Sequence, residues 1–207
     1  MKLPFSIKTI SNFAEFRIKE KGSLFIGMCF PVNNESEAAE ELSKIKKKYY
    51  DATHNCFAYK LTDGTIKYSD DGEPNGTAGI RILNAINHFD LNNILVIVTR
   101  YFGGIKLGVG LLGKTYYDAA YECLQNSQNL EKILYNKLII SYNYDSFSIV
   151  HRCISKYNAV IEKNLFDEMP RIVSLVPVEI KDKFINELTS YIHNQIKIQE
   201  TDFFIYL

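Results

Sequence analysis

Hydrophobic residues alternate or recur at helical spacing through the first part of the chain, and polar turn residues separate the segments. The pattern predicts strands at residues 13–18, 24–30, 54–61, 66–69 and 94–99, and helices at residues 35–50, 80–89 and 111–124. The five consecutive aliphatic residues 94–98 are typical of a strand that is covered on both faces. Asn34 and Glu37 stand where a capping box would start the first helix.

The second part of the chain has its own complete set of elements. Its pattern predicts strands at residues 137–144, 159–166, 171–177 and 196–206, and helices at residues 145–156 and 180–192. The order strand, helix, strand, strand, helix, strand (βαββαβ) is that of the ferredoxin-like fold. By the order of their elements, both parts belong to the α+β class.

The distribution of glycine marks a division into two domains. All 11 glycines lie at or before Gly113. The residues that follow must therefore form their turns and close backbone contacts without glycine. The polar stretch at residues 125–129 follows a predicted helix and precedes a predicted strand. We therefore expect an N-terminal domain over residues 1–130 and a C-terminal domain over residues 131–207.

Composition narrows the class of protein. The chain has 207 residues, of which 46% are hydrophobic, and a formal net charge of +0. The hydrophobic share excludes a mainly disordered chain. Because the net charge is zero, any site that binds an anion must depend on a local group of basic residues. The longest apolar run is too short for a membrane helix, and the start of the chain lacks the apolar region of a signal peptide. None of the four cysteines forms a CxxC pair. We expect reduced thiols, a cytoplasmic protein and no membrane contact.

A glycine-rich segment, TRYFGGIKLGVGLLGKTY at residues 99–116, carries the first candidate site. It runs from a buried strand through several glycines into a helix, and this geometry presents backbone N–H groups to an anion. The predicted anion- or nucleic-acid-binding residues are Arg100, Gly103, Gly104, Lys106, Gly108, Gly110 and Lys114. The spacing matches no standard nucleotide motif. The alternative stays open that these glycines only allow tight turns and that Arg100 and Lys106 pair with Asp70, Asp71 or Glu73.

A second segment, DDGEPNGTAGIRIL at residues 70–83, places Asp70, Asp71 and Glu73 before a turn that leads into a helix. Its charge is opposite to that of Arg100 and Lys106, so we expect the two segments to lie side by side. Arg100 is expected to pair with Asp70 or Asp71.

His54 begins a predicted strand and is a candidate for acid–base chemistry only if the acids fold close to it. The chain has no nucleophile elbow and no zinc-ligand spacing. We therefore assign no catalytic residue, and we expect no metal and no cofactor.

These segments resemble the IMPACT family, whose bacterial members are the YigZ-like proteins. The resemblance rests on ATHNCFAY at residues 52–59, SDDGEPNGTAGIRIL at residues 69–83 and VTRYFGGIKLGVGLLGKTY at residues 98–116. The chain departs from the family pattern in having Arg81 where Pro is usual, Leu111 where Gly is usual and Thr115 where Ala is usual. It also has Ser23 and Leu24 where the family commonly has Ser and Arg.

The resemblance implies a fold for each domain. It implies that the first resembles the second domain of a small-subunit ribosomal protein (the ribosomal-protein S5 domain 2-like fold). It implies that the second resembles the last domain of elongation factor G, which is ferredoxin-like. These likenesses favour a non-enzymatic cytoplasmic protein that binds RNA or the ribosome and is linked to translation regulation. Two alternatives stay open, an enzyme that acts on a phosphorylated or peptide substrate through the acids and the glycine-rich segment, and a scaffold that binds a protein partner.

Overall fold

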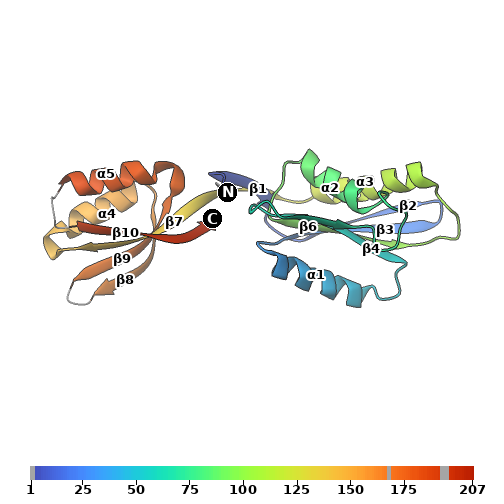
Figure 1. Cartoon of the computed structure of the whole chain (residues 1–207), viewed down its shortest axis with the longest axis horizontal. Helices are drawn as coiled ribbons and strands as arrows, with labels where there is room; N and C mark the ends of the chain where they lie inside the picture. The colour runs from blue at the N-terminus through green and yellow to red at the C-terminus, as the bar shows by residue number, and fades with distance from the viewer. Residues whose placement is uncertain (1–2, 167–168, 192–195) are drawn as a thin grey trace. The chain divides into compact units, whose positions relative to one another are not determined.

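The computed structural model describes residues 3–166, 169–191 and 196–207, and these form two compact units (Figure 1). The first unit is Ile7–Glu131, and the second is Lys132–Leu207 together with the residues just before Ile7. In chain order the elements are β1 (Ser6–Ile10), β2 (Ala14–Glu20), β3 (Ser23–Pro31), α1 (Glu35–Lys48), β4 (His54–Lys60), β5 (Ile66–Ser69), α2 (Gly79–His88), β6 (Ile94–Tyr101), α3 (Val109–Gln125), β7 (Asn129–Tyr142), the short 3₁₀ turn Tyr144–Ser146, α4 (Phe147–Lys156), β8 (Val160–Phe166), β9 (Pro170–Pro177), the 3₁₀ turn Val178–Ile180, α5 (Lys181–Tyr191) and β10 (Ile196–Tyr206).

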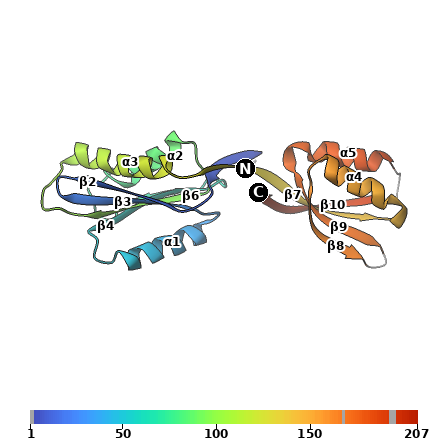
Figure 2. The same cartoon turned by 180° about the vertical axis from the view of Figure 1, so that it is seen from behind.

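The first unit is an antiparallel sheet in the order β2-β3-β6-β4-β5, with helices on both faces. Helix α1 covers one face, and α2 and α3 cover the other (Figures 1 and 2). Each face has its own hydrophobic core, and the central strand β6 contributes to both. The aliphatic residues 94–98 of β6 are fully buried. The prediction of a strand covered on both faces is therefore confirmed.

Helix α1 begins as its sequence predicts. The Asn34 side chain accepts the Glu37 backbone N–H at 2.9 Å, and the Glu37 carboxylate in turn accepts the Asn33 backbone N–H at 2.8 Å. The first bond satisfies an N–H that a helix start would otherwise leave without a partner, and the second ties the residue before the cap to the first turn. The helix ends at Lys48, two residues before the predicted end, with Tyr49 as its C-cap.

The turn between β2 and β3 lies directly against the chain that follows β6. Gly22 adopts a φ of +80° in this turn, and a Cβ added to Gly103 would stand 1.9 Å from the Gly22 carbonyl carbon. Both positions therefore need glycine, one for its backbone conformation and one for the close approach. This contact fixes the start of the glycine loop, by which we mean residues 102–108.

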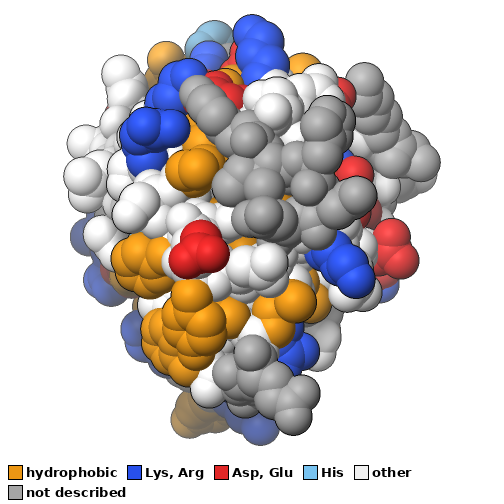
Figure 3. Space-filling view, turned by 90° about the vertical axis from the view of Figure 1, so that its left-hand side faces the viewer, with side chains coloured by type: hydrophobic (Ala, Val, Ile, Leu, Met, Phe, Trp, Pro, Cys, Tyr) orange, Lys and Arg blue, Asp and Glu red, His pale blue; other side chains and the backbone are white. Residues whose placement is uncertain are grey.

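The second unit has the predicted ferredoxin-like arrangement. Strands β10, β7, β9 and β8 are antiparallel neighbours in that order, in a five-stranded sheet in which β1 also pairs with β7. Helices α4 and α5 pack on one face of this sheet. Leu138, Ile140 and Phe184 are fully buried in the core between helices and sheet. Figure 3 looks at the end of this unit and shows hydrophobic side chains grouped on part of the surface, with Lys and Arg side chains around them. The predicted α+β class is confirmed for the chain.

Several boundaries differ from the predicted ones. Strand β1 was not predicted, because five residues of mixed polarity carry too short an alternation to stand out. Strand β7 begins at Asn129 rather than at residue 137, within the polar stretch expected to join the domains. Helix α4 begins at Phe147, since the residues before it form a 3₁₀ turn. The predicted end of the last helix, residue 192, lies outside the described residues.

Candidate functional site

The two segments singled out in the sequence lie side by side. The Arg100 Nη1 donates to the Glu73 Oε1 at 2.6 Å, and this bond joins the end of β6 to the turn before α2. The predicted proximity of residues 70–79 and 100–106 is therefore confirmed. The expected pairing of Arg100 with Asp70 or Asp71 is wrong, because the turn points both of those carboxylates elsewhere.

Glu73 is the centre of a buried polar cluster. Its side chain is only 4% exposed, and besides Arg100 it accepts the Tyr116 hydroxyl at 2.7 Å. The His54 Nε2 lies 3.8 Å from the other carboxylate oxygen. Burial of a carboxylate is costly unless it is paired and hydrogen-bonded, and these partners meet that need. The cluster links β4, β6 and α3 to the acidic turn.

Asp70 holds the start of α2. Its carboxylate accepts the backbone N–H groups of Gly76, Ala78 and Gly79 at 2.8–2.9 Å. Burial by itself raises the pKa of the Asp70 carboxyl, but the three N–H donors together outweigh burial, so the pKa lies below its ordinary value. Asp70 is thus a charged structural residue whose oxygens are occupied by the backbone.

Asp71 is also engaged. One oxygen accepts the Asn55 backbone N–H at 2.7 Å, and the other pairs with Lys46 of α1 at 2.8 Å. The Asp71 carbonyl lies 2.8 Å from the His54 Nδ1. Since a carbonyl only accepts, the proton of a neutral His54 ring is on Nδ1. The three acids and His54 therefore hold the turn together, and none of the three carboxylates lacks a partner.

The nearby thiol is not activated either. Burial is the main cause that raises the pKa of Cys56 to about 12, and its Sγ contacts the Asp70 carbonyl and the Tyr116 hydroxyl. A thiol with such a pKa is protonated at neutral pH and is a poor nucleophile. These residues of the first unit therefore hold the acidic turn in place, and none of them is an activated nucleophile.

The glycine loop ends at the N-terminus of α3, and this helix start is open. Gly108 is the N-cap, with a φ of +78°, and no side chain caps the helix. The first helical bond is from the Leu112 N–H to the Gly108 carbonyl at 2.9 Å. The preceding N–H groups, of residues 109–111, have no acceptor within the helix. A Cβ added at Gly104, Gly108 or Gly110 would meet no atom within 4 Å, so nothing covers the loop at these points.

A cavity of about 340 Å³ lies between this helix start and the acidic turn. Arg100 and Glu73 form its charged wall, and the Arg100 Nε is buried with no hydrogen-bond partner among the described residues. Phe102 and Val109 expose apolar surface beside it, and the Arg100 guanidinium lies 5.5 Å from the Phe102 ring centroid. The residues that line the cavity are Glu73, Pro74, Arg100, Phe102, Lys106, Leu107, Gly108, Val109 and Leu112.

The other predicted site residues divide between this cavity and the structural frame. Lys106 lines the cavity and is exposed. Gly103 donates its N–H to the Ser23 hydroxyl at 3.1 Å and packs on Gly22, so its role is structural. Lys114 pairs with Asp118 one turn along α3 and does not line the cavity. Arg81 also lies outside the cavity, with its Nε 3.3 Å from where a Cβ on Gly113 would stand.

Sequence reasoning missed several residues of the cavity wall. Leu107 and Leu112 have the pattern of ordinary core positions, and Pro74 that of a turn. Phe102 could have been predicted as exposed, because an aromatic residue directly before two glycines is hard to bury. Ser23 was also missed as a partner of the loop: it is fully buried, and its hydroxyl accepts from both Arg100 and Gly103.

Two further observations bear on function. Among the described residues there is no group of three or more His, Cys, Asp or Glu side chains that could hold a metal ion. No helix in the described part of the chain has both the length and the apolar character needed to cross a membrane.

The sequence is similar to other proteins over most of its length. Residues 21–124 match the model of the Impact N-terminal domain. The chain is 31% identical to the IMPACT family member YvyE of Bacillus subtilis, covering 93% of this chain and 89% of that protein. It is 29% identical to an IMPACT family member of Haemophilus influenzae, covering 89% of this chain and 91% of that one.

The eukaryotic likeness is confined to part of the chain. A protein IMPACT homolog of Dictyostelium discoideum is 39% identical over 97 residues, which are 44% of this chain and 28% of that protein.

Among solved structures, a crystal structure described as that of a hypothetical protein superposes with a TM-score of 0.71, at 22% identity, over 97% of this chain and 99% of the other. That likeness shows a shared fold.

Proposed function

The chain belongs to the IMPACT family, and from this premise we propose that it is a non-enzymatic binding protein that contacts RNA or the ribosome through its glycine loop and is linked to translation regulation. The bound group is a phosphate. It lies at the N-terminus of α3, where N–H groups and the helix dipole attract an anion. Lys106 adds a side-chain charge, and Phe102 offers an exposed ring on which a base can stack.

The observation that carries this proposal is the Arg100 Nε. A buried donor without an acceptor costs free energy, and here it belongs to a residue of the cavity wall beside an uncapped helix start. An acceptor that enters the cavity would remove that cost. The open helix start and the Arg100 Nε without a partner are independent features, and both favour an anionic ligand.

The state of the acids favours binding over catalysis. Asp70, Asp71 and Glu73 are each occupied by backbone groups or by basic side chains, as described above. A general acid or base needs to reach a substrate proton. The alternative of an enzyme that works through these acids therefore has less support than a binding function.

The local charge also sets the expected strength of binding. Arg100 and Lys106 are the two basic side chains of the cavity wall. Neutralising about two phosphates of a single strand gives a salt slope of about −1.4, so the affinity should fall roughly sevenfold for a fourfold rise in salt. Such binding is weak and local, in keeping with a formal net charge of +0.

The sharpest test is the variant Gly110→Asp. Gly110 is the second residue of α3 and has open space where a side chain would stand, so an aspartate fits and places its own carboxylate over the free N–H groups. An acid at a helix start stabilises the helix. We expect the variant to melt no lower than the parent protein but to bind a labelled poly(U) oligonucleotide at least tenfold more weakly, by fluorescence anisotropy and by co-sedimentation with ribosomes.

A matched control is Lys47→Ala. Lys47 lies on α1, on the opposite face of the sheet from α3 (Figure 1), and its removal changes the net charge by the same amount. Binding by this variant should equal that of the parent protein. No retention of RNA or ribosomes at low salt, or equal binding by Gly110→Asp, would overturn the proposal.

A further inference from the structure

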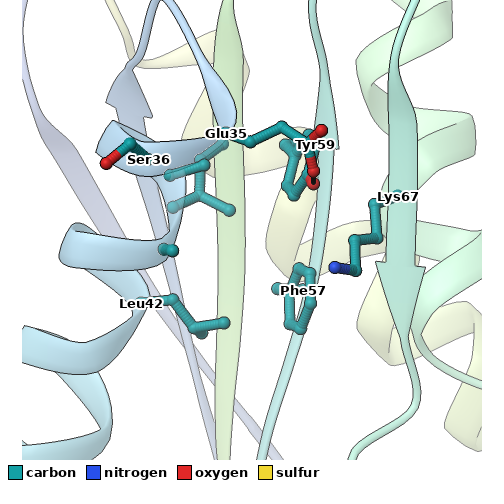
Figure 4. A pocket seen from close by; sticks show the side chains of 9 residues that line it. Glu35, Ser36, Leu42, Phe57, Tyr59 and Lys67 are labelled. Atoms are coloured by element: carbon teal, nitrogen blue, oxygen red, sulfur yellow. Dashed lines mark hydrogen bonds between the residues drawn. The ribbon is translucent and has the colours of Figure 1, made fainter.

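A second cavity, on the other face of the first unit, is not part of the glycine-loop site. It has a volume of about 310 Å³ and lies between α1 and the strands β4 and β5 (Figure 4). Its lining residues are Glu35, Ser36, Ala38, Ala39, Leu42, Phe57, Tyr59, Lys67 and Leu95. Two small residues of α1 leave room for the cavity: Ala38 is buried against the sheet and Ala39 is exposed at the mouth.

The interior of this cavity is apolar. Phe57 and Tyr59 stand side by side on β4 with nearly parallel rings, 6.3 Å apart between centroids and inclined by 12°. Leu95 of β6 and Ala38 of α1 are buried and also line the cavity. Leu42 forms the wall on the helix side (Figure 4). A flat or slender apolar body fits between the aromatic wall and the helix.

The mouth of the cavity carries two opposite charges that do not pair with each other. The Glu35 carboxylate accepts the Tyr59 hydroxyl at 2.6 Å. Burial, and then this bond, raise the pKa of Tyr59 to about 12, so the hydroxyl keeps its proton and its bond to Glu35. Lys67 lies opposite Tyr59 in the ladder between β4 and β5, and therefore on the same face of the sheet.

Lys67 is an exposed cation of this cavity that has no acidic partner among the described residues. Within the described part of the chain its ammonium makes no ion pair and no side-chain hydrogen bond, although Asp and Glu together number 24. Figure 4 shows its side chain reaching from β5 toward the cavity and ending near the Phe57 ring, while Glu35 is turned to Tyr59. The cavity thus combines an apolar interior with one available cation, the arrangement of a small-molecule site with few polar contacts.

We propose that this cavity binds a small monocarboxylate with an apolar body, whose carboxylate pairs with Lys67 and whose body lies between the Phe57 and Tyr59 rings and α1. The volume corresponds to about ten water molecules, so the ligand has about ten non-hydrogen atoms. Phenylacetate and hexanoate have this size and chemistry and serve as probes. This site is separate from the proposed RNA contact and does not depend on it.

The test is a binding titration of the full chain by calorimetry and by NMR, with phenylacetate, hexanoate and their neutral amides. Saturable binding of the carboxylates, at least fivefold tighter than of the amides, is expected. Lys67→Gln should weaken carboxylate binding about fivefold, the effect of one partly exposed ion pair. Glu35→Gln should strengthen it slightly, because a repelling charge is removed while the acceptor for Tyr59 remains.

Ala39→Leu tests the apolar part of the proposal. Ala39 is exposed on α1, so a larger side chain can fill the cavity mouth without entering the core. It should weaken binding of both carboxylates while the melting temperature stays within the range of the other variants. Lys60→Gln, a change of charge outside the cavity wall, is the control. No saturable binding of either carboxylate, equal binding of the amides, or no effect of Lys67→Gln would each overturn the proposal.

Discussion

The guanidinium of Arg100 and the carboxylate of Glu73 form a buried ion pair, with Nη1 and Oε1 2.6 Å apart and both side chains at most 6% exposed. This pair joins the end of β6 to the turn that precedes α2. Ser23 supports it from the start of β3, since its hydroxyl lies 3.4 Å from the Arg100 Nη2. The glycine loop begins two residues after Arg100, so the pair also sets where that loop starts.

Arg100→Ala should lower the free energy of unfolding by about 3–5 kcal/mol, because the change leaves the Glu73 carboxylate buried without its cation. Urea unfolding at neutral pH measures this loss. Lys114→Ala is the matched control: its ion pair with Asp118 is exposed and should be worth less than about 1 kcal/mol. A loss below about 1 kcal/mol for Arg100→Ala would contradict the importance of the pair.

Gly103→Ala should destabilise the first unit by about 1–3 kcal/mol, because its Cβ would stand 1.9 Å from the Gly22 carbonyl carbon and the backbone of the β2–β3 turn would have to move. Gly110→Ala, in the same segment, has open space at the Cβ and helical backbone, so it should stabilise by up to about 1 kcal/mol. Thermal melts of the two variants should shift in opposite directions. Equal shifts would show that the close approach to Gly22 is not tight in solution.

Asp70→Asn should make stability less dependent on pH in the acid range. The native pKa of Asp70 is below its ordinary value, so ionisation stabilises the fold above the unfolded pKa of about 3.9. That contribution is lost as the pH falls through the lower, native pKa. The variant should therefore be less stable than the parent protein near pH 7, and the difference should shrink below about pH 4. A difference that stays constant from pH 7 to pH 3 would contradict this role.

The sequence sufficed to predict that residues 70–79 and 100–106 are neighbours, because both leave the sheet to start a helix and carry opposite charges. It could not show which acid meets Arg100. Asp71 adopts a φ of +43° and Gly72 a φ of +90°, and this turn swings Glu73 inward while Asp70 faces the start of α2. Two successive residues with left-handed backbone conformation result from the packing of the whole turn. The charge and spacing of the residues do not predict them.

Burial patterns were predicted more reliably than cavities. The aliphatic residues 94–98 of β6 indicated a strand between two layers, and the structure has that arrangement. Leu107 and Leu112 have the same apolar character, yet they line the cavity beside the glycine loop. Whether an apolar side chain meets another or an open space depends on what faces it across the fold.

The last prediction concerns Lys106 and Arg100, the two cations of the cavity wall. Lys106 is exposed and makes no ion pair within the described residues, so Lys106→Ala should leave the free energy of unfolding within about 1 kcal/mol of the parent value. If the loop binds phosphate, this variant should still bind poly(U) several-fold more weakly and show a salt slope that is smaller by about 0.7. Arg100→Ala, in contrast, should lose both stability and binding.

Paired thermal melts and binding titrations separate these outcomes. Lys114→Ala is the control for charge at α3, because its ion pair with Asp118 keeps it away from the cavity, and it should bind RNA as the parent protein does. An unchanged salt slope for Lys106→Ala would mean that the loop does not contact phosphate. A destabilised Lys106→Ala with intact binding would instead make the glycine loop purely structural, because the exposed lysine would then support the fold rather than a ligand.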